Sequence, residues 1–570
     1  MTNPIPRFSG APVVEGVSAD VVIVGSGVVG GLAAHALATL GHSVILLDAG
    51  PRIDRVEAVE RFRASPTKGS NAPYENPWYA PQPDDADFNS YYVQTAGQKT
   101  FQGLYVRGVG GTSWHWTGHA ERHYPNDFRM KSAYGVGVDW PISYDDMLPY
   151  YLRVEREWGV AGDDNDYIGP DRHGEKFPLP KVPMSYSDHE IGKVSKQVAF
   201  GYDCAGTRFA PVPLEYGPYP HARNSIPHDG RPQCCGNASC RFVCPIAAKY
   251  DASVHVTKAE LLGVRVLDKR VVHHVETGPS GMIAGVRYRH PDGWEGRAVG
   301  RRYILAAHAI ETPKLLLMST GEYAPRGVAN SSGMVGRNLI ALADVNTMGL
   351  AVDETFPYRG PVSATGGLKA LRDGDFRKVH GAIATNFVNG GWNASLGPAQ
   401  RAQKLIGEGV FGADLAKRML EQTAREVTLG SMVDVLPDPS NRIVPDFEKL
   451  DALGIPRPKV TFAWNEYTDR GIQVARDMHR AIFTAMKVPK DTWQEPEPDV
   501  EMAVIAGTTR MGTDPRDSVV DTSCKAHDHP NLYIIGTGVY PTTGIVSPSM
   551  TAAGLALRAA DEIHANFGHG

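Results

Sequence analysis

The 570-residue sequence has no excess of positive charge and no long apolar run. Lys and Arg number 58 against 63 Asp and Glu, so no broad cationic surface for nucleic acid or anionic lipid is expected. The most apolar stretches, at 20–50 and 546–560, are interrupted by Gly, Ser, His or charged residues. Neither reaches the roughly 18 to 20 continuous apolar residues that span a bilayer. These absences favour a small neutral substrate.

Residues 1–18 contain no basic stretch followed by an apolar one, so we expect no secretory signal there. Export with a partner protein would leave no such signal, and both the cytoplasm and the periplasm stay open. Hydrophobic residues make up 42% and charged residues 21%, as in ordinary soluble globular proteins. The length exceeds that of one compact domain, so two or more joined domains are expected.

An early segment has the pattern of a β-α-β unit. Residues 19–24 form a β-branched run, residues 28–40 are small and helix-favouring, and residues 43–47 supply a second strand. The sequence Gly-Ser-Gly-Val-Val-Gly at 25–30 joins the first strand to the helix, and Asp48 ends the second strand. Strand, turn, helix and acid together form the complete fingerprint of a dinucleotide-binding unit.

Each residue of the fingerprint has a physical role. Gly25 permits the tight turn, Gly27 lets the backbone approach a pyrophosphate, and Gly30 lets the helix pack on the strand. The helix N-terminus supplies positive potential, and the Asp48 carboxylate can accept hydrogen bonds from ribose hydroxyls. The fingerprint alone does not distinguish FAD from NAD. A second Gly-rich turn at 108–112 could bring the backbone close to the pyrophosphate or the isoalloxazine.

Later elements predict that the first domain is discontinuous. A strand at 301–307 followed by a helix at 310–318 resembles a late step of the same sheet. A short strand at 531–535 leads into a closing helix at 547–565.

The remaining regions have weaker patterns. Residues 51–100 are polar and rich in Pro, Asn, Asp and Tyr, which predicts a long loop region over a binding site. Residues 344–498 alternate short strand-like runs, such as 459–464, with helical ones, such as 470–486. We assign this alternating region to a substrate domain.

Four segments, 25–30, 110–118, 309–313 and 531–561, resemble the glucose-methanol-choline (GMC) flavin oxidoreductases. The resemblance implies FAD and an α/β protein with a Rossmann-like FAD domain and an α+β substrate domain built on an antiparallel sheet. The implied FAD domain comprises 18–120, 250–343 and 500–566, and the substrate domain comprises 121–249 and 344–499. The expected cofactor-binding residues are Gly25, Gly27, Gly30, Asp48, Gly110, Gly111, Thr112 and His115.

Within that family, the sequence is most similar to iron–sulfur-containing flavoprotein subunits of bacterial sugar and sugar-acid dehydrogenases. The resemblance implies a dehydrogenase that oxidises a hydroxyl of a sugar, a glycoside or a related alcohol. It also implies a small companion subunit and a cytochrome or quinone as electron acceptor.

His115 lies in Ser-Trp-His-Trp-Thr, which is similar to the Ser-x-His-Trp-Thr segment of pyranose oxidases. That histidine carries the flavin covalently, so the resemblance implies a bond between His115 and the FAD 8α carbon. The other interpretation is a histidine that packs beside two tryptophans near the flavin without a bond.

Four of the six cysteines, Cys234, Cys235, Cys240 and Cys244, fall within eleven residues, and Pro245 follows the last. Such closely spaced thiolates suit an iron–sulfur cluster or another soft metal, and zinc or disulfides are the alternatives. The similar segment of iron–sulfur glucose dehydrogenase flavoproteins holds a three-iron cluster with three thiols. By that resemblance the ligands are Cys234, Cys240 and Cys244. The two other cysteines, Cys204 and Cys524, are predicted to be buried small residues.

The catalytic pair departs from the family pattern. GMC enzymes use a histidine to take the substrate hydroxyl proton, with a second His or Asn beside it. Alignment on Gly507-Thr-Thr-Arg-Met-Gly places Val504 at the first position, and Ser547 stands at the second, before Pro548. Valine moves no proton, and a serine hydroxyl is a weak base. We interpret Ser547 as the N-cap of the closing helix.

Three explanations stay open for this departure. The base could be relocated to His119, His123, His308 or another histidine, alcohol oxidation could be lost, or the alignment could be displaced. The leading expectation is an FAD-dependent dehydrogenase that passes electrons through the cluster to a partner. The competing one is a flavin and iron–sulfur subunit for electron transfer or binding without alcohol oxidation.

Overall fold

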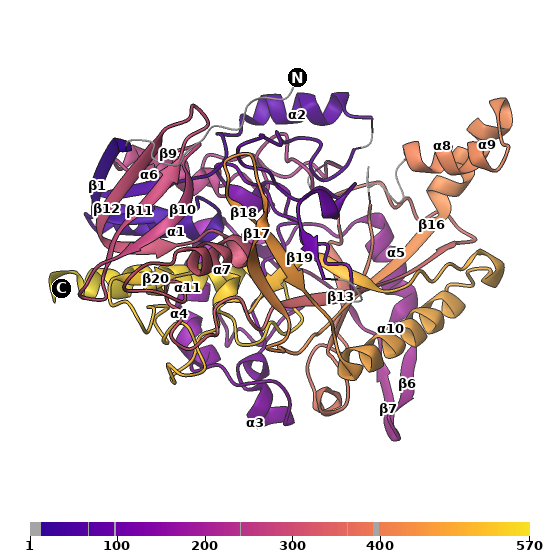
Figure 1. The fold of residues 1–570 in the computed structure, drawn as a ribbon. Coiled ribbons are helices and arrows are strands. Elements are labelled where there is room, and N and C mark those ends of the chain that lie inside the picture. The colour runs from indigo at the N-terminus through magenta and orange to yellow at the C-terminus, as the bar shows by residue number, and fades with distance from the viewer. Residues whose placement is uncertain are drawn as a thin grey trace.

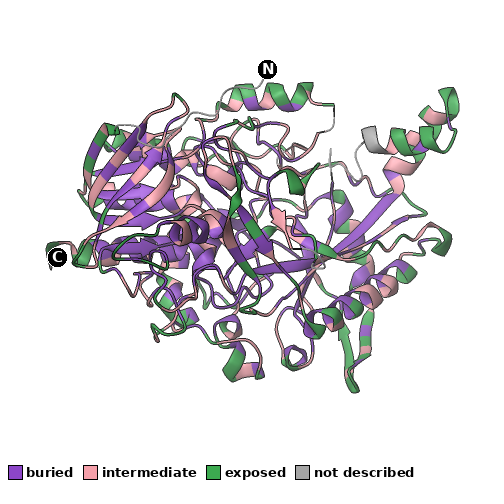
Figure 2. Ribbon diagram, viewed as in Figure 1, coloured by how far each residue is buried: buried purple, intermediate pink, exposed green. Residues whose placement is uncertain are grey.

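The computed structural model describes residues 13–66, 68–95, 99–239, 241–361, 363–390 and 398–569. Two sheets organise this part of the chain, one toward each side of the molecule in Figure 1. The strands of both sheets are largely buried (Figure 2). Among the described residues, no helix combines the length and the apolar character needed to cross a membrane.

The larger sheet contains the predicted β-α-β unit. Its strands, in spatial order, are β10 (Val271–Thr277), β11 (Ile283–Arg289), β12 (Glu295–Leu305), β1 (Val13–Val24), β2 (Val44–Leu47) and β9 (Arg265–Leu267), and β20 (Leu532–Ile534) also pairs with β12. β1 pairs in parallel with β2 and β12, whereas β10, β11 and β12 are antiparallel neighbours. The strands predicted at 19–24, 43–47, 301–307 and 531–535 all lie in this sheet, so segments far apart in the sequence build it together.

Helices pack around this sheet and complete an apolar core. They are α1 (Val28–Thr39), α4 (Tyr144–Trp158), α6 (Ser253–Leu261), α7 (His308–Met318) and α11 (Ser549–Ala565). α1 packs against both α6 and α11. The helices predicted at 28–40 and 310–318 are confirmed. The N-cap prediction for Ser547 is wrong, because α11 begins at Ser549 and Pro548 therefore occupies the N-cap. Ser547 lies outside the helix, and its backbone N–H donates to Glu121.

The smaller sheet is antiparallel throughout, as the predicted fold class requires. Its strands are β15 (Ile383–Phe387), β16 (Glu426–Val433), β13 (Ile340–Leu350) and β19 (Asp499–Ala506), in that order. Helix α10 (Glu466–Ala485) covers one face, where the His479 ring forms hydrogen bonds with Thr347 of β13 and Ser431 of β16. The α/β fold class with an antiparallel second sheet is confirmed, whereas the division into domains stays a prediction.

The region 51–100 is only partly the loop that its composition predicts. Helix α2 (Arg55–Ala64) begins after Asp54, whose carboxylate caps its first turn. Only Ala58 and Phe62 of this helix are buried, so its apolar face is too short to show a helical period in the sequence.

Three other features complete the fold. A hairpin of β17 (Arg442–Leu450) and β18 (Pro456–Thr461) takes up β3 (Val93–Gln94) as a third strand. Helices α8 (Pro398–Gly407) and α9 (Gly412–Arg425) project from the body (Figures 1 and 2). The short elements are α3 (Met130–Tyr134), α5 (Tyr186–Ser195), β4 (Ala161–Gly162), β5 (Leu179–Pro180), β6 (Ala199–Cys204), β7 (Thr207–Pro213), β8 (Tyr216–Pro218) and β14 (Gly366–Leu368).

Candidate functional site

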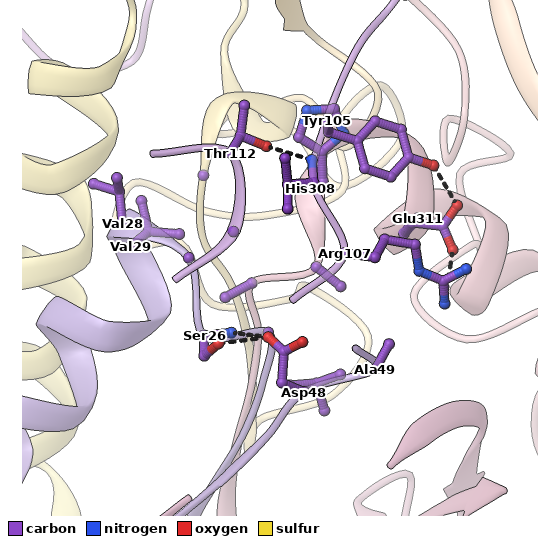
Figure 3. A pocket seen from close by; sticks show the side chains of 18 of the residues that line it. Ser26, Val28, Val29, Asp48, Ala49, Tyr105, Arg107, Thr112, His308 and Glu311 are labelled. Atoms are coloured by element: carbon purple, nitrogen blue, oxygen red, sulfur yellow. Dashed lines mark hydrogen bonds and ion pairs between the residues drawn. The ribbon is translucent and has the colours of Figure 1, made fainter. Parts of the chain in front are cut away.

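A deep cavity opens beside the carboxyl ends of β1, β2 and β12 (Figure 3). It holds about 1410 Å³ of space free of protein atoms, counted out to its mouth. Parallel sheets bind their ligands in this position, outside the carboxyl ends of the strands. The lining residues fall mainly within 24–29, 47–49, 105–116, 270–272, 306–318, 503–505 and 535–552.

Most of the predicted cofactor residues meet at this cavity. Those that line it are Gly25, Gly27, Asp48, Gly111 and Thr112, while Gly30, Gly110 and His115 are not among the lining residues. They were predicted from two segments separated by about eighty positions in the sequence, and the fold joins them.

The glycine turn requires glycine for packing reasons. A Cβ on Gly30 would lie 1.9 Å from the Gly25 carbonyl oxygen, and a Cβ on Gly25 would lie 2.6 Å from the Ala306 oxygen. A Cβ on Gly111 would lie 3.0 Å from the Cα of Gly27. Because neither Gly27 nor Gly111 carries a side chain, the N-terminus of α1 stays accessible to a ligand in the cavity.

Asp48 holds the turn in place from the end of β2. Its Oδ2 accepts hydrogen bonds from the Ser26 backbone N at 3.0 Å and from the Ser26 hydroxyl, and its Oδ1 accepts from Gly50 N at 3.0 Å. Burial raises the pKa of the Asp48 carboxyl, and these hydrogen bonds oppose the rise. The carboxylate therefore fixes the geometry of the turn and retains lone pairs toward the cavity.

A charged cluster at the cavity was missed from the sequence. Glu311 accepts a hydrogen bond from the Tyr105 hydroxyl and pairs with Arg107 at 4.0 Å (Figure 3). It also accepts a hydrogen bond from the Tyr91 hydroxyl and pairs with Lys314 at 2.9 Å. Burial disfavours the Glu311 carboxylate, but Lys314 and Arg107 outweigh it and hold the pKa well below its usual range. Only the presence of Glu311 in the family-like segment 309–313 gave a signal, since three of its four partners, Tyr91, Tyr105 and Arg107, are about two hundred positions away.

His115 follows the single turn η2 (Gly111–Trp114), beside the cavity. Its Nδ1 is buried and has no hydrogen-bond partner among the described residues, and the Tyr74 ring meets its ring edge-on with centroids 6.2 Å apart. Burial, helped by Lys249 and Arg241, lowers the pKa of His115 to about 3. The imidazole is therefore neutral.

The cysteine loop (residues 234–245) is linked to this segment through Lys249 and Arg55. Cys234 and Cys244 belong to one small apolar cluster, Cys235 is exposed, and Cys240 lies outside the described residues. The Cys244 Sγ accepts a hydrogen bond from the Lys249 backbone N at 3.5 Å. The predicted burial of the two isolated cysteines, Cys204 and Cys524, is confirmed.

One lysine connects the cysteine loop to the cavity wall. The Lys249 ammonium donates to the carbonyl oxygens of Trp114 at 2.9 Å and Trp116 at 2.7 Å, and Trp116 lines the cavity. The Arg55 guanidinium also donates to the Cys244 carbonyl and lies over the Trp114 ring. A group held by these thiols would lie a short distance from the cavity.

The two positions of the family's catalytic pair offer no proton acceptor. The Val504 side chain is buried in the apolar core of the smaller sheet. Ser547 is partly buried, and its neighbours Pro548 and Ser549 line the cavity.

Of the histidines named as replacements, His123 and His119 are engaged away from the cavity, whereas His308 lines it. Both ring nitrogens of His123 are hydrogen-bonded, to Thr551 and to the Thr543 carbonyl. His119 stacks on Tyr219 and does not line the cavity. His308 does line it and stacks on Tyr105, and burial lowers its pKa to about 4.

Comparison with known proteins gives consistent results. Residues 438–556 match the family described as GMC oxidoreductase. The fructose dehydrogenase large subunit of Gluconobacter japonicus is 37% identical over 566 residues, which cover 96% of this chain and 98% of that protein. The 2-methyl-1,2-propanediol dehydrogenase of Mycolicibacterium austroafricanum is 26% identical over 575 residues, with 96% and 95% covered.

Solved structures share the fold. Pyridoxine 4-oxidase from Mesorbium loti superposes with a TM-score of 0.62 at 18% identity, covering 96% of this chain and 99% of that one. A formate oxidase variant of Aspergillus oryzae RIB40, studied for its FAD modification, gives a TM-score of 0.62 at 15% identity, with 97% and 99% covered.

Proposed function

The chain belongs to the GMC oxidoreductase family and is an FAD-dependent oxidoreductase, and within that family we propose that it oxidises a hydroxyl of a sugar, a glycoside or a related alcohol. The observation that carries the proposal is the 37% identity with a fructose dehydrogenase large subunit over nearly the full length of both chains. The name of that relative also supports a sugar-like substrate and a companion subunit for this chain.

We place the FAD along the cavity. Its pyrophosphate would lie against Gly27 and the N-terminus of α1, its ribose near Asp48, and its flavin end toward Thr112 and Ala503. The absence of side chains at Gly27 and Gly111 and the retained lone pairs of Asp48 fit such a ligand. FAD, when bound, takes up the two electrons that leave an alcohol as a hydride. We also propose His115 as the covalent attachment point, since its neutral imidazole has a buried Nδ1 without a partner.

The cysteine loop is proposed to hold an iron–sulfur cluster of the three-iron type through Cys234, Cys240 and Cys244. The shared packing of Cys234 and Cys244 supports two of these ligands. Such a cluster would supply one-electron transfer, and the Lys249 and Arg55 links between the loop and Trp114 or Trp116 suit an exit from the flavin to a cytochrome or quinone. Lys249 would position the loop against the cavity wall through its two carbonyl contacts.

The absence of a base at Val504 and Ser547 favours a second candidate function. In it, the protein is a flavin and iron–sulfur subunit that transfers electrons or binds a ligand without oxidising alcohols. One experiment separates the two. The anaerobic holoenzyme is mixed with sugars, glycosides, sugar acids and small diols while the absorbance of oxidised flavin is followed. Bleaching by one of these compounds is expected, and a flavin that only dithionite bleaches would favour the second candidate.

A further inference from the structure

Strand β19 contains a large, irregular bulge beside the cavity. Ala341 pairs with Ile505 and Ala343 pairs with Val500, so residues 501–504 stand opposite Leu342 alone. Bulges next to active sites change the direction of side chains. Here the bulge places Ala503 in the cavity wall and turns the Val504 side chain into the apolar core.

Glu501 closes this bulge with one carboxylate oxygen. Its Oε2 accepts hydrogen bonds from the backbone N of Ala503 and of Val504, both at 2.6 Å. The carboxylate is therefore held against the backbone of the position where the family pattern has its histidine. The other oxygen, Oε1, has no hydrogen-bond partner among the described residues, and the side chain is only partly buried.

Two polar residues of β13 accompany Glu501. Asp344 and Asn346 lie two positions apart on β13, on the face of the sheet opposite α10, and the Asp344 Oδ2 accepts a hydrogen bond from the Asn346 amide at 2.8 Å. Burial and the adjacent Glu501 charge raise the pKa of Asp344 to about 6, while Arg241 opposes the rise and Asp499 adds to it. Glu501, Asp344 and Asn346 are each partly exposed and stand next to the cavity wall at Ala503, although they are not among its lining residues. Carboxylate and amide groups on one sheet face suit the hydroxyls of a polar substrate.

We propose that Glu501 accepts the hydroxyl proton of the substrate and that Asp344 and Asn346 orient the substrate. This role of Glu501 rests on the proposed function. Oxidation of CH–OH to C=O breaks the C–H and O–H bonds. The hydride leaves carbon with both electrons for the FAD, and the proton forms a new O–H bond at Oε1 of Glu501. A general base must lie within hydrogen-bond reach of the proton that it removes. Burial raises the pKa of Glu501, which favours proton uptake, although the two backbone hydrogen bonds and the Arg241 charge oppose the rise.

A second carboxylate, the buried Glu121, lies near Ser547 but is less suited to accept a proton. Glu121 pairs with Arg372 at 2.9 Å through Oε1, and its Oε2 accepts from Ser547 N at 3.3 Å. Both of its oxygens are engaged, and the guanidinium stabilises the charged form. In the described part of the chain, Glu501 keeps one oxygen without a hydrogen-bond partner and forms no ion pair, although the Arg241 charge is near enough to lower its pKa.

The test compares Glu501→Gln with Asp438→Asn in the holoenzyme. The glutamine keeps an oxygen that can accept from both backbone amides, so the bulge is retained while the charge and the base are lost. Asp438 is an exposed carboxylate that caps Ser440 N at 2.8 Å, which makes its variant a control for loss of one charge. Equal thermal midpoints are expected for both variants.

Sulfite supplies a readout that needs no substrate, because this anion adds to oxidised flavin and bleaches it. Removing a negative charge close to the flavin should tighten sulfite binding about threefold or more in Glu501→Gln and leave Asp438→Asn unchanged. With a compound that bleaches the wild-type flavin, Glu501→Gln should reduce the rate about 100-fold or more.

The two proposals fail in different ways. Wild-type bleaching that Glu501→Gln does not slow would overturn the role of Glu501 and leave the alcohol oxidation standing. If no compound bleaches the wild-type flavin, the proposed function falls, and the sulfite titration then decides alone. A sulfite affinity unchanged by Glu501→Gln overturns the placement of this carboxylate, and a tightened affinity upholds it.

Discussion

Replacement of Asp48 by alanine should weaken FAD binding far more than it weakens the fold. In the native protein, Asp48 accepts hydrogen bonds from Ser26 N, the Ser26 hydroxyl and Gly50 N. The variant leaves these donors at the cavity wall, where water can enter and meet part of their need. We therefore expect a loss of about 1 to 3 kcal/mol in the free energy of unfolding, the range for unsatisfied buried groups.

FAD binding loses a further contact. A hydrogen bond to a charged group contributes about 1.5 to 3 kcal/mol, so the loss of the proposed ribose contact should raise the Kd for FAD about 10-fold to 150-fold. Because a covalent link would retain FAD regardless, both proteins carry His115→Ala. The apo forms are titrated with FAD, and the quenching of flavin fluorescence gives the Kd.

Asp20 offers a matched control in the same pair of strands. Its Oδ2 accepts from Ser43 N at 3.0 Å and from the Ser43 hydroxyl at 2.7 Å, which repeats the Asp48–Ser26 pattern away from the cavity. Asp20→Ala should leave the Kd for FAD unchanged. Equal weakening by both variants would refute the reasoning, because the loss would then follow from strand geometry alone. An unchanged Kd in Asp48→Ala would exclude the ribose contact.

Three further results are expected. Gly30→Ala should lower the thermal midpoint and the FAD content sharply, because its Cβ would lie 1.9 Å from the Gly25 oxygen, whereas Gly16→Ala, with open space around it, should change neither. Asp344→Asn should remove part of the pH dependence of stability. Because the pKa of Asp344 is raised to about 6, the native state binds this proton more tightly than the unfolded state, and the wild-type free energy of unfolding falls as pH rises from about 4 to 6. Urea unfolding at pH 4 and pH 7.5 should show a smaller fall in the variant. Cys244→Ser should lower the iron content of purified protein by metal analysis, and zinc without iron in the wild type would contradict the cluster.

The cofactor-binding half of the fold could be predicted because its determinants are local. The turn at 25–30 needs glycine for contacts that the sequence pattern encodes, and its strand and helix are read from short periodicities. The contacts of Glu311 with Arg107 and the Tyr91 hydroxyl could not be predicted, since they join segments that no local pattern relates. Helix α2 was missed although its contacts are local, because only two of its residues are buried and they give no helical period in the sequence.

The catalytic positions show a different limit. Alignment places Val504, which cannot serve as a base, at the position of the family's histidine, and the search for a substitute considered histidines. It did not consider Glu501, because three residues along a regular strand would place that side chain on the opposite face. Only the bulge in β19 changes this geometry, and nothing in the sequence 499–506 marks a bulge.

The cavity is completed by a part of the chain that is made long after its floor. Its floor at 24–29 belongs to the first βαβ unit, while 535–537 and Ala552 of α11 form part of its wall. At ribosomal speeds of about 5 to 20 residues per second, the nascent chain waits on the order of a minute between making the one and the other. During that time, the apolar surface of α1 that α11 later covers is exposed. FAD can therefore be fully enclosed only after α11 has been made, and a chain truncated before α11 would be expected to aggregate rather than to bind the cofactor weakly.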